Sequence, residues 1–318
     1  MNAGTRLGLY AGGLVVAFGA AFGLSGLIVP ESLVAGWTEQ SSTRPSHGGE
    51  HTGSTTAAPA QALTGLSLSD ADLVLSPVAA PRVIGEDGTL SFHVEHADGT
   101  AVTDFAEEHD KELHLIVVRS DGSRFQHVHP TMDAAGTWSI PWRWDEAGTY
   151  RAFADFTPAG EDASGVTLTQ LLHVDGQFTS APTEASRVDE VDGFTVTLEG
   201  DVAAGSTSEL AVTVSRDGES VTALEPYLGA FGHLVALREG DLAYLHVHAE
   251  GDEPQAGDTA GPTIGFSAEV PTDGRYLLYF DFQVDGTVHT AEFVVDAAHG
   301  GDVEDSDDSG DQTHSDGH

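Results

Sequence analysis

The stretch HLIVVRSDGSRFQHVH, residues 114–129, holds two short runs on either side of a turn signal, the first of them rich in β-branched residues. Val and Ile favour strands, and Asp-Gly between two such runs is typical of a two-residue hairpin turn. A turn at Asp121-Gly122 pairs positions whose numbers add up to 243, which places His114 opposite His129. His127 lies two residues before His129 and therefore points to the same face. The stretch predicts an antiparallel hairpin that carries three imidazoles on one face.

Short alternating runs recur along the chain and are separated by turn signals rich in Gly and Asp. Examples are LSFHVEH, TYRAFADF, LTQLLHV, FTVTLEG and RYLLYFDF. Alternation with a period of two residues is typical of strands with one buried face. We therefore expect an all-β fold of two tandem Ig-like antiparallel β-sandwiches, at residues 70–176 and 192–296, with a linker at residues 177–191.

The second expected domain repeats part of the first. A shift of 119 places residues 98–129 over residues 217–248, and ten of these thirty-two pairs are identical. The identical pairs include His114 with His233, His127 with His246, and His129 with His248. A second block, GTYRAFADF against GRYLLYFDF, aligns at a shift of 126. The two blocks indicate a diverged duplication.

The duplicated histidines are candidate metal ligands. Opposite Cβ atoms in an antiparallel pair lie about 5 Å apart, which lets two imidazole nitrogens reach one ion at about 2.0 Å each. We therefore predict that copper(II) or zinc(II) binds to two histidine clusters, one in each copy: His114, His127 and His129, and His233, His246 and His248. The fourth ligand stays open between water and a group from another strand. The alternative is that these histidines are ordinary polar residues on the solvent face of a hairpin.

Two turns are compatible with the second copy. A turn at Gly240-Asp241 pairs His233 with His248, whereas a turn at Glu239-Gly240 pairs His233 with His246. Either register keeps the three histidines on one face. The second block also matches Asp155 with Asp281, and these are weaker candidates for ligands or for partners of the ligands.

Composition narrows the classes of site and partner. The chain has no Cys, two Met and 16 His, which excludes thiolate zinc sites, iron–sulfur clusters and blue copper and leaves imidazole sites. Asp and Glu number 51 against 12 Lys and Arg, so a formal charge of −39 repels nucleic acids and anionic lipid surfaces. No nucleophile elbow, phosphate loop or zinc-protease helix is visible, and we expect a protein that is not an enzyme.

The amino-terminal part predicts a membrane anchor. Residues 7–29 are 23 residues without a charge, long enough to cross a bilayer as a helix. Arg6 precedes this segment, so we expect residues 1–30 to be an uncleaved single-pass anchor in the cell membrane, with a cytoplasmic amino terminus and extracellular domains. Residues 31–69 have the composition of a flexible linker, and residues 297–318 that of a disordered tail rich in acidic residues and His.

The motifs also resemble known families. GTYRAFADF followed by LTQLLHVDG resembles the last two strands of small Ig-like exported domains of the copper-resistance and YtkA-like kind. The layout, with MNAGTRLGLYAGGL and HLIVVRSDGSRFQHVHP, resembles actinobacterial membrane-anchored proteins described as heavy-metal-binding or secreted proteins. The resemblance implies heavy-metal homeostasis outside the cell, by buffering, sequestration or delivery of the ion, with a metal-transport or chaperone protein as partner. Copper-resistance domains often use an amino-terminal His, which cannot apply where the amino end precedes a membrane helix.

Two other functions stay open. Paired Ig-like domains can form an extracellular interaction module in which the histidines are incidental or sensitive to pH. His-Val-His on a β-sandwich is also similar to the copper ligands of Cu,Zn superoxide dismutase, which would make the protein a copper enzyme. This chain lacks the disulfide and an evident bridging His of those enzymes.

Overall fold

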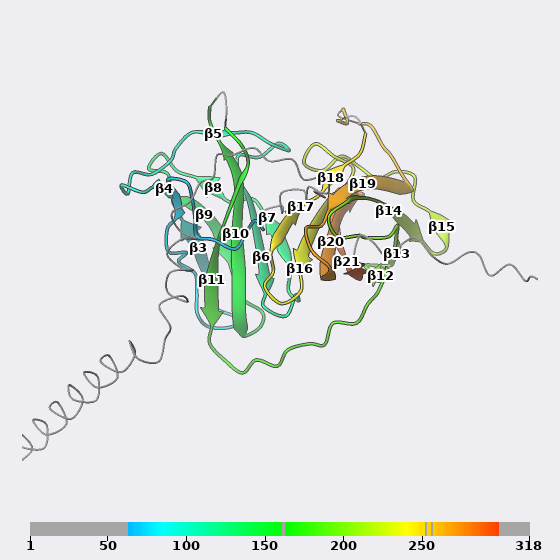
Figure 1. The fold of residues 1–318 in the computed structure, drawn as a ribbon, viewed down its shortest axis with the longest axis horizontal. Helices are drawn as coiled ribbons and strands as arrows, with labels where there is room; N and C mark the ends of the chain where they lie inside the picture. Colours follow the sequence, from blue (N-terminus) through cyan, green and yellow to red (C-terminus); the bar gives the residue numbers. More distant parts are fainter. Residues whose placement is uncertain (1–62, 161–162, 252, 256, 299–318) are drawn as a thin grey trace, which may run out of the picture. The chain divides into compact units, whose positions relative to one another are not determined.

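The computed structural model describes residues 63–160, 163–251, 253–255 and 257–298 (Figure 1). Every regular element in these ranges is a β-strand, and the sheets are antiparallel, which confirms the predicted all-β class. None of the described residues forms a helix long and apolar enough to cross a membrane. The predicted membrane helix, most of the predicted linker at residues 31–69 and nearly all of the predicted tail lie outside the described residues.

The first repeat, residues 64–176, builds three sheets. Its strands are β1 (Ser69–Asp70), β2 (Leu73–Leu75), β3 (Gly88–Phe92), β4 (Val94–His96), β5 (Phe105–Ala106), β6 (His114–Arg119), β7 (Gln126–Val128), β8 (Thr131–Met132), β9 (Trp138–Trp142), β10 (Gly148–Pro158) and β11 (Val166–Val174). The largest sheet has the order β11-β10-β6-β7, with β5 paired to β10. The other two sheets are β1-β2-β4 and β3-β9-β8.

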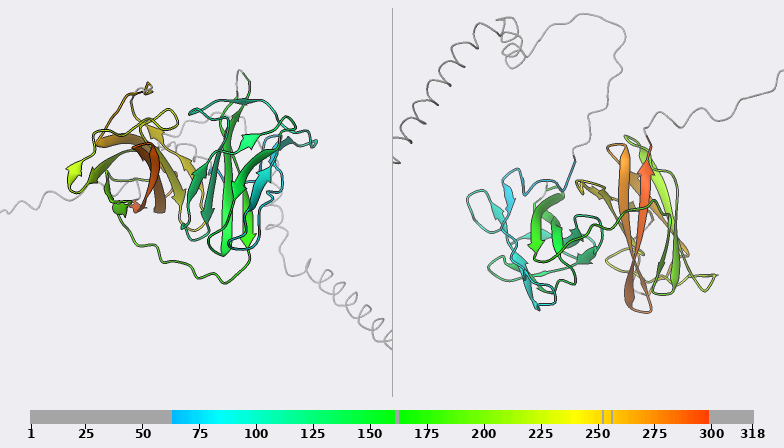
Figure 2. Two further views of the ribbon diagram at one scale, coloured as in Figure 1. Left: turned by 180° about the vertical axis from the view of Figure 1, so that it is seen from behind. Right: turned by 90° about the horizontal axis from the view of Figure 1, so that it is seen from below.

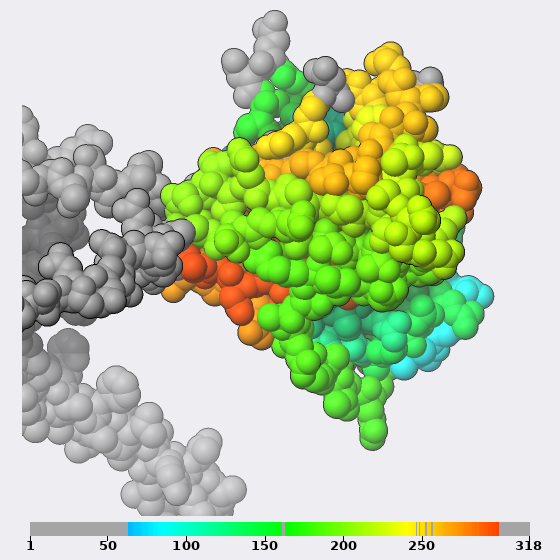
Figure 3. Space-filling model, turned by 90° about the vertical axis from the view of Figure 1, so that its right-hand side faces the viewer, coloured from blue at the N-terminus to red at the C-terminus, as the bar shows by residue number. Residues whose placement is uncertain are grey.

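The second repeat, residues 186–298, builds two sheets. Its strands are β12 (Val188–Val191), β13 (Phe194–Glu199), β14 (Thr207–Arg216), β15 (Glu219–Ser220), β16 (His233–Arg238), β17 (Tyr244–His246), β18 (His248–Ala249), β19 (Thr263–Glu269), β20 (Gly274–Val284) and β21 (Thr287–Ala297). One sheet has the order β17-β16-β20-β21, which matches β7-β6-β10-β11 of the first repeat. The other has the order β12-β13-β14-β19-β18, with β15 paired to β14, and its strands β13 to β15 run across the face seen in Figure 3.

Each repeat has its own hydrophobic core. The first core contains Trp138 and Trp144, and the second contains Phe266, Phe280 and Phe293, all at most 2% exposed. The views of Figure 2 show the strands of the first repeat (blue to green) and those of the second (yellow-green to red) as two groups. The alternating runs of the sequence account for these cores, because every second side chain of such a strand faces inward.

A third core joins the two repeats. It contains Ile116, Val118 and Phe153 from the first repeat and residues of β16, β17 and β20 from the second. In β6, Leu115 and Val117 belong to the first core, so this strand is buried on both faces. Figure 1 shows β6 and β7 beside β16 and β17. Burial on both faces explains why the middle of this strand, Leu115 to Val118, is apolar and does not alternate.

The contact between the repeats uses matching positions. The rings of Phe125 and Tyr279 stack with centroids 4.0 Å apart, and those of Phe153 and Tyr244 lie 5.7 Å apart. The repeat places Tyr244 at the position of Phe125 and Tyr279 at that of Phe153. The two hairpin sheets therefore pack against each other in a pseudo-symmetric way, which our sequence analysis did not predict.

Two predicted boundaries differ from the structure. Strand β12 lies inside the linker predicted at residues 177–191, because a turn at Asp192-Gly193, with φ of 50° and 83°, pairs it with β13. The linker predicted at residues 31–69 ends too late as well. Thr64 already forms a β-bridge with Tyr244, and β1 begins at Ser69.

Candidate metal centre

The hairpin that carries the first histidine cluster has the predicted register. Leu115 pairs with Val128, and Ile116 with His127, so the paired numbers add up to 243. The turn holds Gly122 at a φ of 84°, a left-handed conformation that favours glycine. Arg119 braces the same turn, because its guanidinium donates hydrogen bonds to both oxygens of the Asp121 carboxylate.

The three histidines of this hairpin converge. Among the side chains that the structure describes, His114, His127 and His129 form the one group whose ligand atoms all lie within 4.8 Å of one another. His114 Nδ1 lies 3.0 Å from His127 Nε2 and 3.2 Å from His129 Nε2. Two nitrogens that each lie 2.0–2.1 Å from a tetrahedral ion are about 3.3 Å apart. The two distances from His114 Nδ1 are therefore close to those between ligands of a single ion.

Hydrogen bonds to acceptors outside the cluster fix the tautomers of the neutral His114 and His127 rings. His114 Nε2 donates to the carbonyl oxygen of Glu108 at 3.2 Å, and His127 Nδ1 donates to Asp281 Oδ2 at 2.8 Å. In the neutral rings, the nitrogens that face each other, His114 Nδ1 and His127 Nε2, both carry lone pairs. Two lone pairs 3.0 Å apart repel unless a proton or a metal ion lies between them. Histidines that bind metals show this pattern of an outer N–H donated to a carbonyl or a carboxylate.

Burial favours the neutral form of two of these imidazoles, His114 and His129. It lowers the pKa of His114 to about 4 and that of His129 to about 2, and the charge that His127 would carry lowers both further. Metal binding requires the unprotonated ring, and at neutral pH the lowered pKa values leave the nitrogens of His114 and His129 available.

His233 occupies the matching place in the second repeat. Its Nε2 donates to the carbonyl oxygens of Tyr227 at 2.8 Å and Leu228 at 3.1 Å. Tyr227 is the position that the shift of 119 matches with Glu108, so both repeats hold this histidine in the same way. Burial lowers the pKa of His233 to about 4, although the hydrogen bond to the Tyr227 carbonyl opposes the shift.

The structure selects one register for the second hairpin. Val235 pairs with His246, which corresponds to the turn at Gly240-Asp241 and excludes the turn at Glu239-Gly240.

The predicted pairing of His233 with His248 is wrong. The chain leaves β16 after His246, and β18 pairs with β19 of the other sheet, where His248 lies opposite Ser267. The connection from β18 to β19, residues 250–262, is longer than the connection from β7 to β8 of the first repeat, residues 129–130. The side chains of His246 and His248 lie outside the described part of the structure, so the second predicted site stays a prediction.

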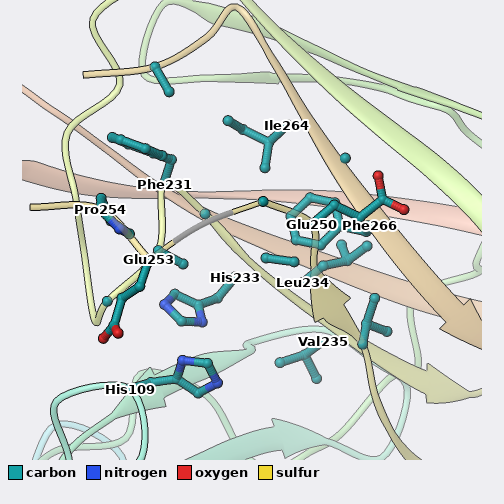
Figure 4. Close-up of a pocket in the computed structure, with 18 of the residues that line it drawn as sticks. His109, Phe231, His233, Leu234, Val235, Glu250, Glu253, Pro254, Ile264 and Phe266 are labelled. Carbon is teal, nitrogen blue, oxygen red and sulfur yellow. The ribbon is translucent and has the colours of Figure 1, made fainter. Parts of the chain in front are cut away.

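A cavity of about 640 Å³ adjoins the first cluster and is lined by both repeats. The first repeat contributes His114 and His127 to its lining, and the second contributes His233 and Glu250. His109 also lines it, and Figure 4 shows its ring beside that of His233, with centroids 5.3 Å apart. The cavity gives an ion or a small ligand a place next to the cluster.

The role of Asp281 was underestimated in our sequence analysis. Its Oδ2 accepts a hydrogen bond from His127, a residue of the other repeat. The signal was present in the sequence, because the repeated block matches Asp281 with Asp155. A contact between the repeats cannot be read from that match alone.

The family described as "Domain of unknown function (DUF8832)" matches residues 71–169 and 189–299. The chain belongs to this family. Its two matched segments lie within the two repeats described above, apart from residue 299. No curated protein matches the chain.

Several solved structures resemble the chain at low similarity. The adhesin InvE of Yersinia pseudotuberculosis is 12% identical with a TM-score of 0.20, and the match covers 70% of this chain and 57% of that one. The mouse nectin-like molecule 4 ectodomain, Ig1–Ig3, is 14% identical with a TM-score of 0.20, covering 74% and 66%. The D0-D1 domain of Intimin is 13% identical with a TM-score of 0.18, covering 69% and 96%. The chain thus spans little more than half of the InvE structure.

Proposed function

We propose that the protein binds copper(II) or zinc(II) through His114, His127 and His129. The observation that carries this proposal is the convergence of three imidazole nitrogens, with His114 Nδ1 3.0 Å from His127 Nε2 and 3.2 Å from His129 Nε2. In its neutral form, each of the rings of His114 and His127 donates its N–H to an acceptor outside the cluster. A neutral ring that turned this N–H towards the cluster would lose that hydrogen bond. Imidazole suits both metals, and a chain without Cys offers no thiolate.

The role that fits such a site is buffering, sequestration or delivery of the ion outside the cytoplasm. Three histidines leave part of the coordination sphere to water or to a group of a donor or acceptor protein, which permits exchange of the ion. The formal charge of −39 attracts cations to the surface and raises their local concentration. No catalytic step is proposed. The position outside the cell rests on the apolar segment at residues 7–29 and on the resemblance to exported copper-resistance domains.

Competitive calorimetry of the full chain tests metal binding. Cu(II) and Zn(II) are titrated in the presence of a weak chelator, which suppresses binding to exposed carboxylates. The variant His114→Ala/His129→Ala removes two ligands, and the control His96→Ala/His173→Ala removes two exposed histidines, 44% and 71% accessible. We expect at least one tight equivalent in the wild type and the control, and one equivalent fewer in the ligand variant. Equal binding by all three proteins would contradict the proposal.

An Ig-like interaction module is the second candidate. It is favoured by the hydrogen bond between His127 and Asp281, which links the two repeats without any metal. On this account the histidines stabilise the contact between the repeats and the protein binds a macromolecule elsewhere. The titration above distinguishes the two functions, because this account predicts no tight equivalent.

A further inference from the structure

The first histidine cluster lies where the two repeats meet. His114 pairs with Asp155 across β6 and β10, and His233 pairs with Asp281 across β16 and β20. Each repeat thus presents a His–Asp pair on the sheet that contributes to the third core. The rings of His127 and His233 lie 6.2 Å apart and those of His129 and Tyr227 6.4 Å apart, so residues of both repeats surround the cluster.

Asp281 is a buried carboxylate with an unusual set of partners. Its side chain is 4% exposed, and that of His127 is 5% exposed. Its Oδ1 accepts a hydrogen bond from the Thr290 hydroxyl, and its Oδ2 accepts the N–H of His127. Among the described ion pairs, its partner is His127, which carries a charge only when protonated, and no Lys or Arg faces this carboxylate. A buried negative charge is costly unless a positive charge compensates it.

A proton on His127 Nε2 supplies that compensation in the absence of metal, and a metal ion bound at the same nitrogen would replace it. The ion would lie on the far side of the imidazole ring, and the carboxylate would increase the basicity of the ligand nitrogen through the shared N–H. The carboxylate also holds the ring orientation and the tautomer that direct Nε2 towards His114. Both effects depend on a residue of the second repeat, whereas the ligand belongs to the first.

We infer that the metal centre is shared between the two repeats, with Asp281 of the second repeat as the positioning residue for the ligand His127 of the first. Docking of the repeats and binding of the ion therefore strengthen each other. An ion that binds more tightly when the repeats are docked shifts the chain towards the docked state. The inference rests on the proposed binding of copper(II) or zinc(II) by the cluster.

The variant Asp281→Asn tests this inference in the full chain. An amide keeps the size of the side chain and removes the charge. Loss of such an outer partner typically lowers metal affinity about 10- to 100-fold, and we expect this loss for Zn(II) and Cu(II). The Cu(II) EPR spectrum of the saturated variant should shift as well, because the donor strength of His127 changes.

Tyr244→Phe is the matched control. Tyr244 donates from its hydroxyl to Asp155 Oδ2 at 3.0 Å, so this variant also removes one hydrogen bond between the repeats. It removes no partner of a ligand, and we expect the affinity to stay within about threefold and the EPR spectrum to stay unchanged. A mere weakening of the contact between repeats would affect both variants alike and would overturn the inference.

The remaining outcomes are distinct. A wild-type chain that binds neither ion would overturn the proposed function and this inference with it. A wild-type chain that binds tightly, beside an Asp281→Asn variant with the same affinity and spectrum, would overturn the inference alone.

Discussion

Exchange of His114 for Gln should make the stability of the protein less sensitive to acid. Burial, together with the charge of His127, lowers the pKa of His114 to about 4 from its ordinary value of 6.5. As the pH falls from 6.5 towards 4, the unfolded chain takes up a proton at this residue and the folded chain does not. The stabilising contribution is therefore complete above pH 6.5 and is lost on the way down to about pH 4. Gln does not titrate, and its amide can donate to the Glu108 carbonyl as His114 does.

The size of the effect follows from the width of the window. Two pH units, from 6.5 to 4.5, at about 1.4 kcal/mol per unit correspond to about 3 kcal/mol in the free energy of unfolding. Part of the shift belongs to the coupling with His127, so we expect the wild type to lose about 2 kcal/mol more than His114→Gln between pH 7 and pH 4.5. Protonation of surface carboxylates affects both proteins equally and cancels in this comparison.

Urea unfolding followed by tryptophan fluorescence measures this difference, with a chelator present to exclude metal. Work above pH 4.5 avoids the range in which Asp121 titrates, because its hydrogen bonds, with Arg119 first, lower its pKa to about 2. His173→Gln, at a side chain that is 71% exposed, is the control and should follow the wild type. The same fall in the free energy of unfolding between pH 7 and pH 4.5 for the wild type and His114→Gln would refute the reasoning.

Three further predictions concern the contact between the repeats. Phe153→Ala removes a fully buried ring of the third core and should cost about 3–5 kcal/mol in urea unfolding, whereas Leu171→Ala, at a residue 59% exposed, should cost less than about 0.5 kcal/mol. Tyr279→Phe removes the hydroxyl that donates to the Gly122 carbonyl. It should lower the free energy of unfolding by about 1–3 kcal/mol, because a buried acceptor loses its partner. An unchanged unfolding midpoint would contradict that contact. Gly122→Ala should lower the melting temperature measured by calorimetry. A Cβ at this position would lie 2.4 Å from Leu277 Cδ1, and the φ of 84° disfavours Ala. A melting temperature equal to that of the wild type would exclude this packing.

Local features of the sequence predicted the first hairpin correctly. The turn at Asp121-Gly122 fixes the register, and a fixed register determines which side chains share a face. The pairing of Ile116 with His127 follows directly from it. The three histidines lie within sixteen residues, so their convergence needs no contact between distant parts of the chain.

Features that depend on distant contacts were not predicted. The apolar run at residues 115–118 and its counterpart at 234–237 do not alternate, which was a sign that β6 and β16 are buried on both faces. Their neighbour across the third core could not be identified, because any apolar surface could cover them. The move of His248 to the other sheet depends on Ser267 as its partner, nineteen residues further along the chain. The bond from His127 to Asp281 spans 154 residues and has no local signal.

Anomalous diffraction from crystals of the zinc- or copper-loaded protein tests the central claim most directly. We predict an anomalous peak at about 2.0–2.1 Å from His114 Nδ1, His127 Nε2 and His129 Nε2, with the His127 ring still bonded to Asp281. A cluster without a peak, with ions found only on exposed carboxylates, would contradict the account.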